Sequence, residues 1–107
     1  MTNFTLEDLE AIVSERAAST DNKSYTRQLM ERGVSKCAQK VGEEAVEAAI
    51  AAVNGDKQEL IGESADLLYH LLVLLKCSDV SLREVMDTLA SRTGMTGLEE
   101  KASRAEI

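Results

Sequence analysis

Residues 65–75 read ADLLYHLLVLL, and this stretch decides the expected fold. Nine of its eleven residues are apolar, and the two exceptions are Asp66 and His70. A helix that is apolar on nearly every side belongs in the interior of a protein. The sequence therefore predicts that Asp66 is at least partly buried, where a carboxylate must be paired, hydrogen-bonded or bound to a cation. Eleven residues are too few to span a bilayer.

Helix signals surround this stretch on both sides. Thr5 with Asp8, and Ser81 with Glu84, have the spacing of a capping box, which marks the start of a helix. Gly33 is expected to close a short helix as its C-cap. The expected helices run over about residues 6–18, 24–32, 35–53 and 57–77, and a last one follows Ser81. We therefore predict an all-α fold, a helical bundle of four to five helices.

The composition of the 107-residue chain agrees with one small helical domain. The chain has no proline, no tryptophan and three aromatic residues (Phe4, Tyr25 and Tyr69), fewer than sheet proteins of this size carry. We expect a single domain over residues 1–107, with a charged tail at 95–107. No secretory signal is visible at the N-terminus, so we expect a soluble, cytoplasmic protein.

The net charge of −7 narrows the choice of partners. Surfaces that bind nucleic acid or anionic membranes are basic, so we expect neither partner. A phosphate-bearing substrate stays open, because divalent cations can reverse the local charge. Cys37, Cys77 and the one histidine cannot build a four-ligand zinc site. We expect both cysteines to be small core residues in a reducing compartment.

Two pairs of carboxylates lie on neighbouring helices. The first pair is Glu44-x-x-Glu47, and the second is Glu63-x-x-Asp66. The turn signal at 54–56 makes the two helices antiparallel neighbours, so that both pairs aim at one place. Four carboxylates without a thiolate or a histidine pair favour a hard cation, Mg²⁺ or Mn²⁺. The alternative is a purely structural salt-bridge network.

The long helix has two contrasting faces. One face has small side chains and is expected to allow close contact with another helix. It consists of Ala38, Val41, Ala45, Ala48, Ala49 and Ala52. The other face is a charged arc of about 100°. It consists of Lys36, Lys40, Glu43, Glu44 and Glu47. Its three carboxylates repel one another without a cation, which disfavours an ordinary solvated face.

His70 lies one helical turn after Asp66. We expect it to be a core histidine, hydrogen-bonded to Asp66 or to the backbone, that orients Asp66 as a metal ligand. Tyr69 is expected to be a core residue whose hydroxyl reaches a polar partner. Ser24, Tyr25 and Arg27 are expected to be cap, packing and surface positions, and a substrate contact at these residues stays open.

Four segments of the chain together resemble the phosphoribosyl-ATP pyrophosphatases. They are residues 24–26 (SYT), 40–47 (KVGEEAVE), 63–75 and 97–104. The resemblance covers the chain in order from about Leu6 to Arg104. It places the chain among the all-α nucleotide pyrophosphohydrolases, which include MazG-type proteins and dimeric dUTPases. The ExxE…ExxD pattern of that group corresponds to the two carboxylate pairs.

The resemblance implies a MazG-like bundle completed by homodimerisation. It also implies Mg²⁺-dependent hydrolysis of 1-(5-phosphoribosyl)-ATP to 1-(5-phosphoribosyl)-AMP and pyrophosphate, the second step of histidine biosynthesis. The metal ligands that it implies are Glu44, Glu47, Glu63 and Asp66. Glu43 or Glu47 would orient or deprotonate the attacking water. Contacts with substrate phosphates are expected from Lys36, Lys40, Lys101 and Arg104.

Two other functions stay open at this point. The first is a MazG-type or dUTPase-like house-cleaning hydrolase of ordinary nucleoside triphosphates, which shares the carboxylate pattern. Such an enzyme should lack the matches at 24–26 and 100–104. The second is a non-enzymatic helical dimerisation module, which would gain nothing from buried acidic residues.

Overall fold

The computed structural model describes residues 3–21 and 23–94. Over these ranges the chain forms five α-helices and no strand, which confirms the predicted all-α fold. The helices are α1 (Leu6–Ala17), α2 (Tyr25–Glu31), α3 (Val34–Val53), α4 (Lys57–Cys77) and α5 (Leu82–Thr93). Where the sequence predicts a helix boundary, the structure agrees to within one residue. The expected charged tail lies outside the described residues.

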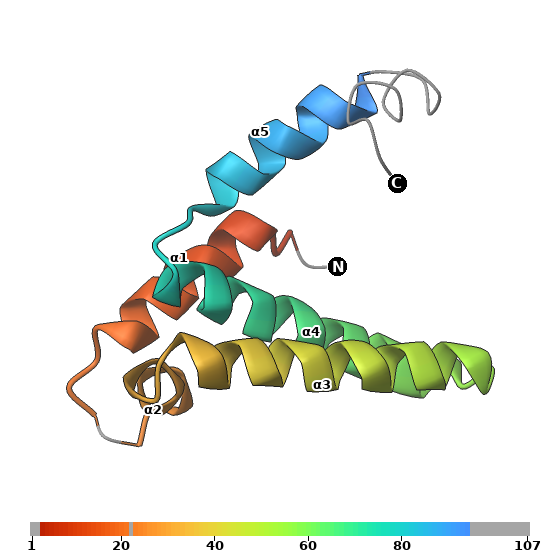
Figure 1. The fold of residues 1–107 in the computed structure, drawn as a ribbon, viewed down its shortest axis with the longest axis horizontal. Helices are drawn as coiled ribbons and strands as arrows, with labels where there is room; N and C mark the ends of the chain where they lie inside the picture. The colour runs from red at the N-terminus through yellow and green to blue at the C-terminus, as the bar shows by residue number, and fades with distance from the viewer. Residues whose placement is uncertain (1–2, 22, 95–107) are drawn as a thin grey trace.

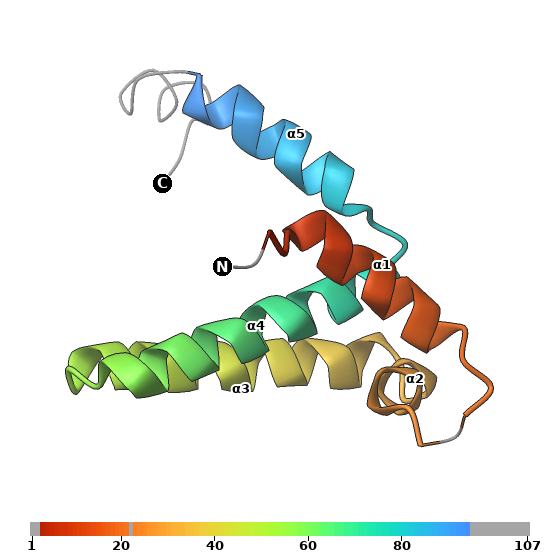
Figure 2. The same cartoon turned by 180° about the vertical axis from the view of Figure 1, so that it is seen from behind.

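α3 and α4 form a long antiparallel hairpin. The two helices have 20 and 21 residues and lie side by side (Figures 1 and 2). Gly55 in the turn between them has a φ of +71°. Asp56 caps α4, because its side chain accepts a hydrogen bond from the backbone N–H of Glu59 at 3.0 Å. The predicted turn and hairpin are therefore confirmed.

The buried core lies at one end of this hairpin. α1 crosses the C-terminal half of α4, and α2 lies beside the start of α3 (Figure 1). The apolar cluster there consists of Val13, Leu29, Cys37, Leu72, Val73 and Leu82. All five helices contribute to this cluster, so it fixes their relative positions at that end.

Both cysteines are free thiols that belong to the core, as expected. Cys37 is buried, and its Sγ donates a hydrogen bond to the carbonyl oxygen of Leu29 at 3.5 Å. Burial raises the pKa of the Cys37 thiol to about 11, so the thiol stays protonated at neutral pH. Cys77 is half-buried and packs against the same cluster.

Both predicted capping boxes are present. The Thr5 hydroxyl accepts a hydrogen bond from the backbone N–H of Asp8 at 3.1 Å, and the Asp8 carboxylate accepts one from the N–H of Thr5 at 3.0 Å. Ser81 and Glu84 make the same reciprocal pair at the start of α5. Each box satisfies backbone donors that a helix start leaves unpaired.

Gly33 connects α2 to α3 without a loop. The C-cap of α2 is Arg32, one residue earlier than expected, and Gly33 is the N-cap of α3. Its φ of +89° lies in a region that side chains with a Cβ rarely adopt. Glycine is therefore suited to this corner between the two helices.

Within one chain, most of the small-residue face of α3 does not make the contact that the sequence predicts. The residues of α3 that are buried are Cys37, Glu44, Ala48 and Ala51. Of the predicted contact face, Ala48 is buried and Val41 is half-buried, whereas Ala38, Ala45, Ala49 and Ala52 are exposed. Within one chain these four alanines therefore pack against no other described helix, because periodicity alone does not choose the side that packs. Close contact of this face with a helix of a second copy stays a prediction.

Asp66 is exposed, which contradicts its predicted burial. The buried residues of α4 are His70, Leu72 and Val73, all in its C-terminal half. That half is covered by α1 and α2 as well as by α3, whereas the N-terminal half lies along α3 alone (Figures 1 and 2). Leu68, just past the middle of α4, is also exposed. Neither α4 nor another helix in the described ranges is long and apolar enough to cross a membrane.

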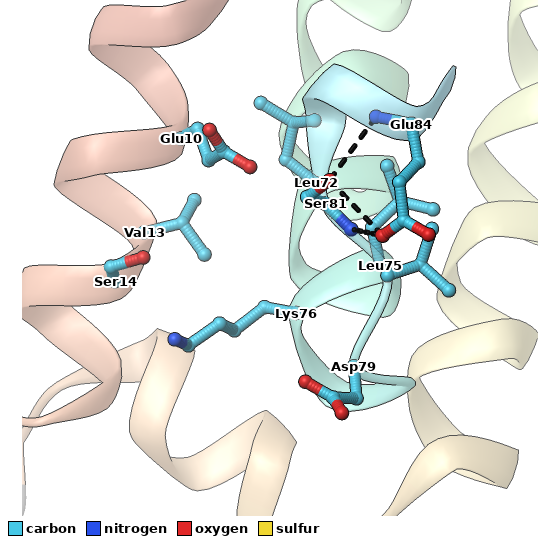
Figure 3. Close-up of a pocket in the computed structure, with 10 residues that line it drawn as sticks. Glu10, Val13, Ser14, Leu72, Leu75, Lys76, Asp79, Ser81 and Glu84 are labelled. Carbon is cyan, nitrogen blue, oxygen red and sulfur yellow. Dashed lines mark hydrogen bonds between the residues drawn. The ribbon is translucent and has the colours of Figure 1, made fainter. Parts of the chain in front are cut away.

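α5 projects away from the hairpin and is held at its start (Figure 1). The Glu10 carboxylate on α1 accepts a hydrogen bond from the backbone N–H of Leu82 at 2.8 Å. Figure 3 shows Glu10 pointing toward Ser81, across a cavity of about 210 Å³ between α1, α4 and α5. Met86 and Leu89, farther along α5, are exposed. Glu10 therefore joins α1 to the first turn of α5.

The Glu10→Ala substitution should lower the free energy of unfolding by about 1–2 kcal/mol, because it removes the acceptor of the Leu82 N–H. Urea denaturation followed by circular dichroism measures this change. Glu15→Ala, at an exposed position on the same helix, is the control and should change it by less than about 0.5 kcal/mol. Equal losses in the two variants would contradict the role of Glu10.

Candidate functional site

The two predicted pairs of carboxylates meet between α3 and α4. Glu44 and Glu47 lie in the middle of α3, and Glu63 and Asp66 lie in the first half of α4. One carboxylate oxygen from each of Glu44, Glu63 and Asp66 lies within 4.8 Å of the other two. Glu44 is 8% exposed, Glu63 is half-buried and Asp66 is exposed. We call Glu44, Glu47, Glu63 and Asp66 the carboxylate cluster.

Glu47 lies at the exposed edge of the cluster. Its carboxylate is within hydrogen-bonding reach of the carboxylates of Glu44 and Glu63. Carboxylates at this distance either share a proton or repel each other. The antiparallel hairpin thus brings together all four residues that the sequence singles out.

The surroundings of Glu63 disfavour its ionised form. Its Oε2 atom is buried and receives no hydrogen bond from the described residues. The hydrogen bond to Glu47, followed by burial, raises the pKa of Glu63 to about 7. Burial and the neighbouring Glu47 also raise the pKa of Glu44. An unpaired buried carboxylate oxygen is costly, and no cationic side chain of the described residues forms a salt bridge with Glu63.

The cluster fits a hard divalent cation. Its donors are all carboxylate oxygens, the ligands that Mg²⁺ and Mn²⁺ prefer. The donor atoms come from two rigid helices and lie close enough to bind one ion between them. Neither ring nitrogen of His70 is available as a ligand, since both form hydrogen bonds. The chemistry of the donors therefore agrees with the predicted metal.

His70 links the cluster to α2. Its Nδ1 donates to the backbone carbonyl of Asp66 at 2.8 Å, since a carbonyl oxygen only accepts. In the neutral ring, Nε2 then accepts a hydrogen bond from the Tyr25 hydroxyl, also at 2.8 Å. The prediction of a core histidine hydrogen-bonded to Asp66 or to the backbone is therefore confirmed, because His70 is buried and contacts the Asp66 backbone, whereas its role in orienting a metal ligand stays a prediction. The side chain that His70 holds directly is that of Tyr25.

Sequence reasoning favoured packing for Tyr25, and only the match at residues 24–26 kept a role at the site open. The structure places the Tyr25 hydroxyl against His70, and the neighbouring Thr26 is buried and bonds to the Tyr69 hydroxyl. The Tyr69 hydroxyl also accepts a hydrogen bond from Arg16 at 3.5 Å. The prediction that this hydroxyl reaches a polar partner is therefore confirmed.

Glu43 lies on α3 next to the cluster but is paired elsewhere. Gln39 donates a hydrogen bond to its carboxylate at 2.8 Å, and the Lys40 ammonium lies 3.3 Å from it. These two contacts lower the pKa of Glu43. Lys40 also lies 3.8 Å from the Glu44 carboxylate, so it borders the cluster.

Of the other three residues predicted to contact substrate phosphates, Lys36 is the one that lies within the described residues. Lys36 lies one turn before Lys40 on α3 and is half-buried. Lys101 and Arg104 lie outside the described residues, so their predicted contacts stay predictions.

Comparison with known proteins gives one family. The family model described as phosphoribosyl-ATP pyrophosphohydrolase matches residues 6–93. A phosphoribosyl-ATP pyrophosphatase from Nitrobacter winogradskyi is 56% identical over 104 residues, which are 97% of this chain and 90% of the relative. The phosphoribosyl-ATP pyrophosphatase 1 of Rhodopseudomonas palustris is 58% identical over 97% of both chains. That of Bradyrhizobium diazoefficiens is 55% identical over 99% of this chain and 100% of its own. This chain therefore belongs to the phosphoribosyl-ATP pyrophosphohydrolase family.

Proposed function

We propose that this chain hydrolyses 1-(5-phosphoribosyl)-ATP to 1-(5-phosphoribosyl)-AMP and pyrophosphate, the second step of histidine biosynthesis. Family membership over residues 6–93 supports this activity. The observation that carries it is the meeting of Glu44, Glu63 and Asp66 oxygens within 4.8 Å on two antiparallel helices. The enzyme is a hydrolase of a phosphoric anhydride, and the cytoplasmic location that we expect for it stays a prediction.

The carboxylate cluster is proposed to hold Mg²⁺, with Mn²⁺ as a substitute. Glu44, Glu63 and Asp66 supply the converging oxygens, and Glu47 adds a fourth at the exposed edge. Bound between these carboxylates, a divalent cation would neutralise charge on the phosphates and on the leaving pyrophosphate. The helices hold the oxygens in place before substrate arrives, which lowers the cost of organising the site.

Glu47 is the better candidate for the base that orients or deprotonates water. Its carboxylate is exposed at the cluster, where substrate and water can reach it. Glu43 is held by Gln39 and Lys40, and these contacts lower its pKa and weaken it as a base. We therefore assign this role to Glu47 in preference to Glu43.

A second copy of the chain is the proposed partner. Val34, Val46, Ile50, Val53, Ile61 and Leu68 are exposed apolar residues of the hairpin. The exposed alanines of α3 extend this surface. The radius of gyration is 16.0 Å, whereas a compact domain of about this length has a radius of roughly 13 Å. An open shape with apolar outer faces supports completion of the bundle by homodimerisation.

Glu47→Gln and Asp66→Asn should each lower pyrophosphate release from phosphoribosyl-ATP with Mg²⁺ by more than about 100-fold, because each removes a charged oxygen from the cluster. Glu59→Gln, an exposed glutamate on α4, is the matched control and should keep wild-type turnover. Full activity of Asp66→Asn would rule out the cluster as the metal site. Comparable wild-type turnover of dUTP would favour a house-cleaning enzyme, and no turnover of any nucleotide would favour a dimerisation module.

Divalent cations should stabilise the protein most above pH 7. The raised pKa of Glu63 means that the folded, metal-free chain binds more protons than the unfolded chain between pH 4.5 and 7. The contribution of Glu63 to stability therefore falls as pH rises through this window. Mg²⁺ should reverse this loss, because it competes with the proton. The test is to measure Tm between pH 4.5 and 7, with and without Mg²⁺, for the wild type and for Glu63→Gln. It measures both the loss of stability with rising pH and its reversal by Mg²⁺. An Mg²⁺-induced rise in Tm that is independent of pH would contradict this account.

The wild-type chain should sediment at twice its mass of 11.6 kDa. Ala49→Glu places a charge on the exposed alanine face of α3 and should yield monomers, although an isolated chain would tolerate it. Gln58→Glu, at an exposed polar position, should leave the dimer intact. Analytical ultracentrifugation of the three proteins distinguishes these results. If Ala49→Glu remains a dimer, the two copies contact each other through a surface other than the alanine face of α3.

A further inference from the structure

A small basic pocket lies beside the carboxylate cluster. It has a volume of about 200 Å³ and lies between α2 and the first half of α3. Its lining consists of Tyr25, Gln28, Leu29, Arg32, Lys36 and Lys40. Three of these six side chains are cations and none is a carboxylate, in a chain whose net charge is −7. The basic pocket is thus a local reversal of the charge of the whole protein.

Two of these cations have no ion pair that would explain them structurally. Arg32 and Lys36 form no salt bridge within the described ranges, whereas Lys40 pairs with Glu43 and Glu44. Lys36 also lies in the first turn of α3, which contains no acidic residue. The helix dipole disfavours a cation at this end. The stability of α3 therefore gives no reason for a lysine at this position.

The basic pocket and the carboxylate cluster share a border. Lys40 lines the pocket, and its Nζ lies 3.8 Å from the Glu44 carboxylate. Tyr25 also lines the pocket, and its hydroxyl is held by His70 at 2.8 Å. His70 in turn donates to the backbone carbonyl of Asp66 in the cluster. The cluster and the pocket are therefore adjacent, with Lys40 and Tyr25 at their border.

The size of the pocket suits one group of a substrate. Sites for drug-sized ligands have volumes of about 300–1,000 Å³, so a pocket of about 200 Å³ accepts a fragment and not a whole nucleotide. Arg and Lys side chains around one point are typical of phosphate recognition. Phosphoribosyl-ATP differs from an ordinary nucleoside triphosphate in carrying a second ribose with a 5-phosphate. That phosphate monoester is a fragment of suitable size and charge.

We propose that the basic pocket binds the 5-phosphate of the substrate's second ribose, with Arg32 and Lys36 as its direct contacts and Tyr25 as the wall toward the carboxylate cluster. This inference rests on the proposed function and extends it to substrate selection. Ordinary nucleoside triphosphates lack this phosphate and leave the two cations unpaired. The pocket therefore determines specificity, while the cluster performs the cleavage.

Arg32→Gln and Lys36→Gln should each raise KM for phosphoribosyl-ATP by about tenfold, through loss of a charge-assisted contact, with little change in kcat. Arg32→Lys should recover part of this loss, because it keeps the charge but not the paired donors. Lys57→Gln, an exposed lysine at the start of α4, is the control and should keep the wild-type KM. Unchanged KM in both pocket variants would overturn the proposal.

Two probes distinguish the phosphates that the pocket could hold. Ribose 5-phosphate should inhibit the wild-type enzyme competitively, and Arg32→Gln should weaken this inhibition about tenfold. Inhibition by inorganic pyrophosphate should be the same in both proteins. If pyrophosphate inhibition is the one that weakens, the pocket holds the polyphosphate end and the proposal is wrong.

Calorimetric titration separates this proposal from the proposed function. If the wild-type chain does not hydrolyse phosphoribosyl-ATP, the proposed function fails, whatever the pocket binds. Ribose 5-phosphate titrated into the wild type and into Arg32→Gln still tests the pocket, because binding needs no turnover. Heat of binding in the wild type that is lost in the variant supports the pocket, and equal heats in both overturn it.

Discussion

The contact between α3 and α4 is the interaction on which the rest of the structure depends. It buries Glu44 of α3 against α4 and brings its carboxylate next to those of Glu63 and Asp66. Packing that forces like charges together is unfavourable by itself, as the raised pKa of Glu63 and its unpaired buried oxygen show. The apolar cluster at the end of the hairpin supplies the favourable free energy that keeps the two helices together. The buried core and the proposed ion site therefore lie at different places along the same pair of helices.

Negative and positive side chains are gathered at two neighbouring places, the carboxylate cluster and the basic pocket. Lys40 lines the basic pocket, and its Nζ lies 3.8 Å from Glu44 of the carboxylate cluster. The hydrogen bond between Tyr25 and His70 connects α2 to α4. α3 contributes to both, because Lys36 and Lys40 of the pocket and Glu44 and Glu47 of the cluster lie on it. The two proposed sites differ in their second helix, which is α2 for the pocket and α4 for the cluster.

Local signals in the sequence predict most of the fold. Capping boxes and the turn at 54–56 act within a few residues, so the starts of α1, α4 and α5 follow from the chain itself. The carboxylate cluster is also predictable, because a tight turn between two helices of known length fixes which residues face each other. What the sequence does not determine is how far the rest of the chain covers the hairpin. Asp66 was expected to be buried because α4 is apolar, but its burial depends on whether another element lies over the first half of α4.

The corner at Gly33 has a consequence for the basic pocket. A Cβ at this position would meet no atom within 4 Å, so the cost of replacing glycine is torsional. With φ at +89° and ψ at 175°, the backbone lies in a region that glycine alone populates readily, and the cost is about 1–3 kcal/mol. Arg32 precedes this corner and Lys36 follows it, so the position of one cation of the basic pocket relative to the other depends on this one backbone torsion. The residues of the carboxylate cluster all lie after it, on α3 and α4.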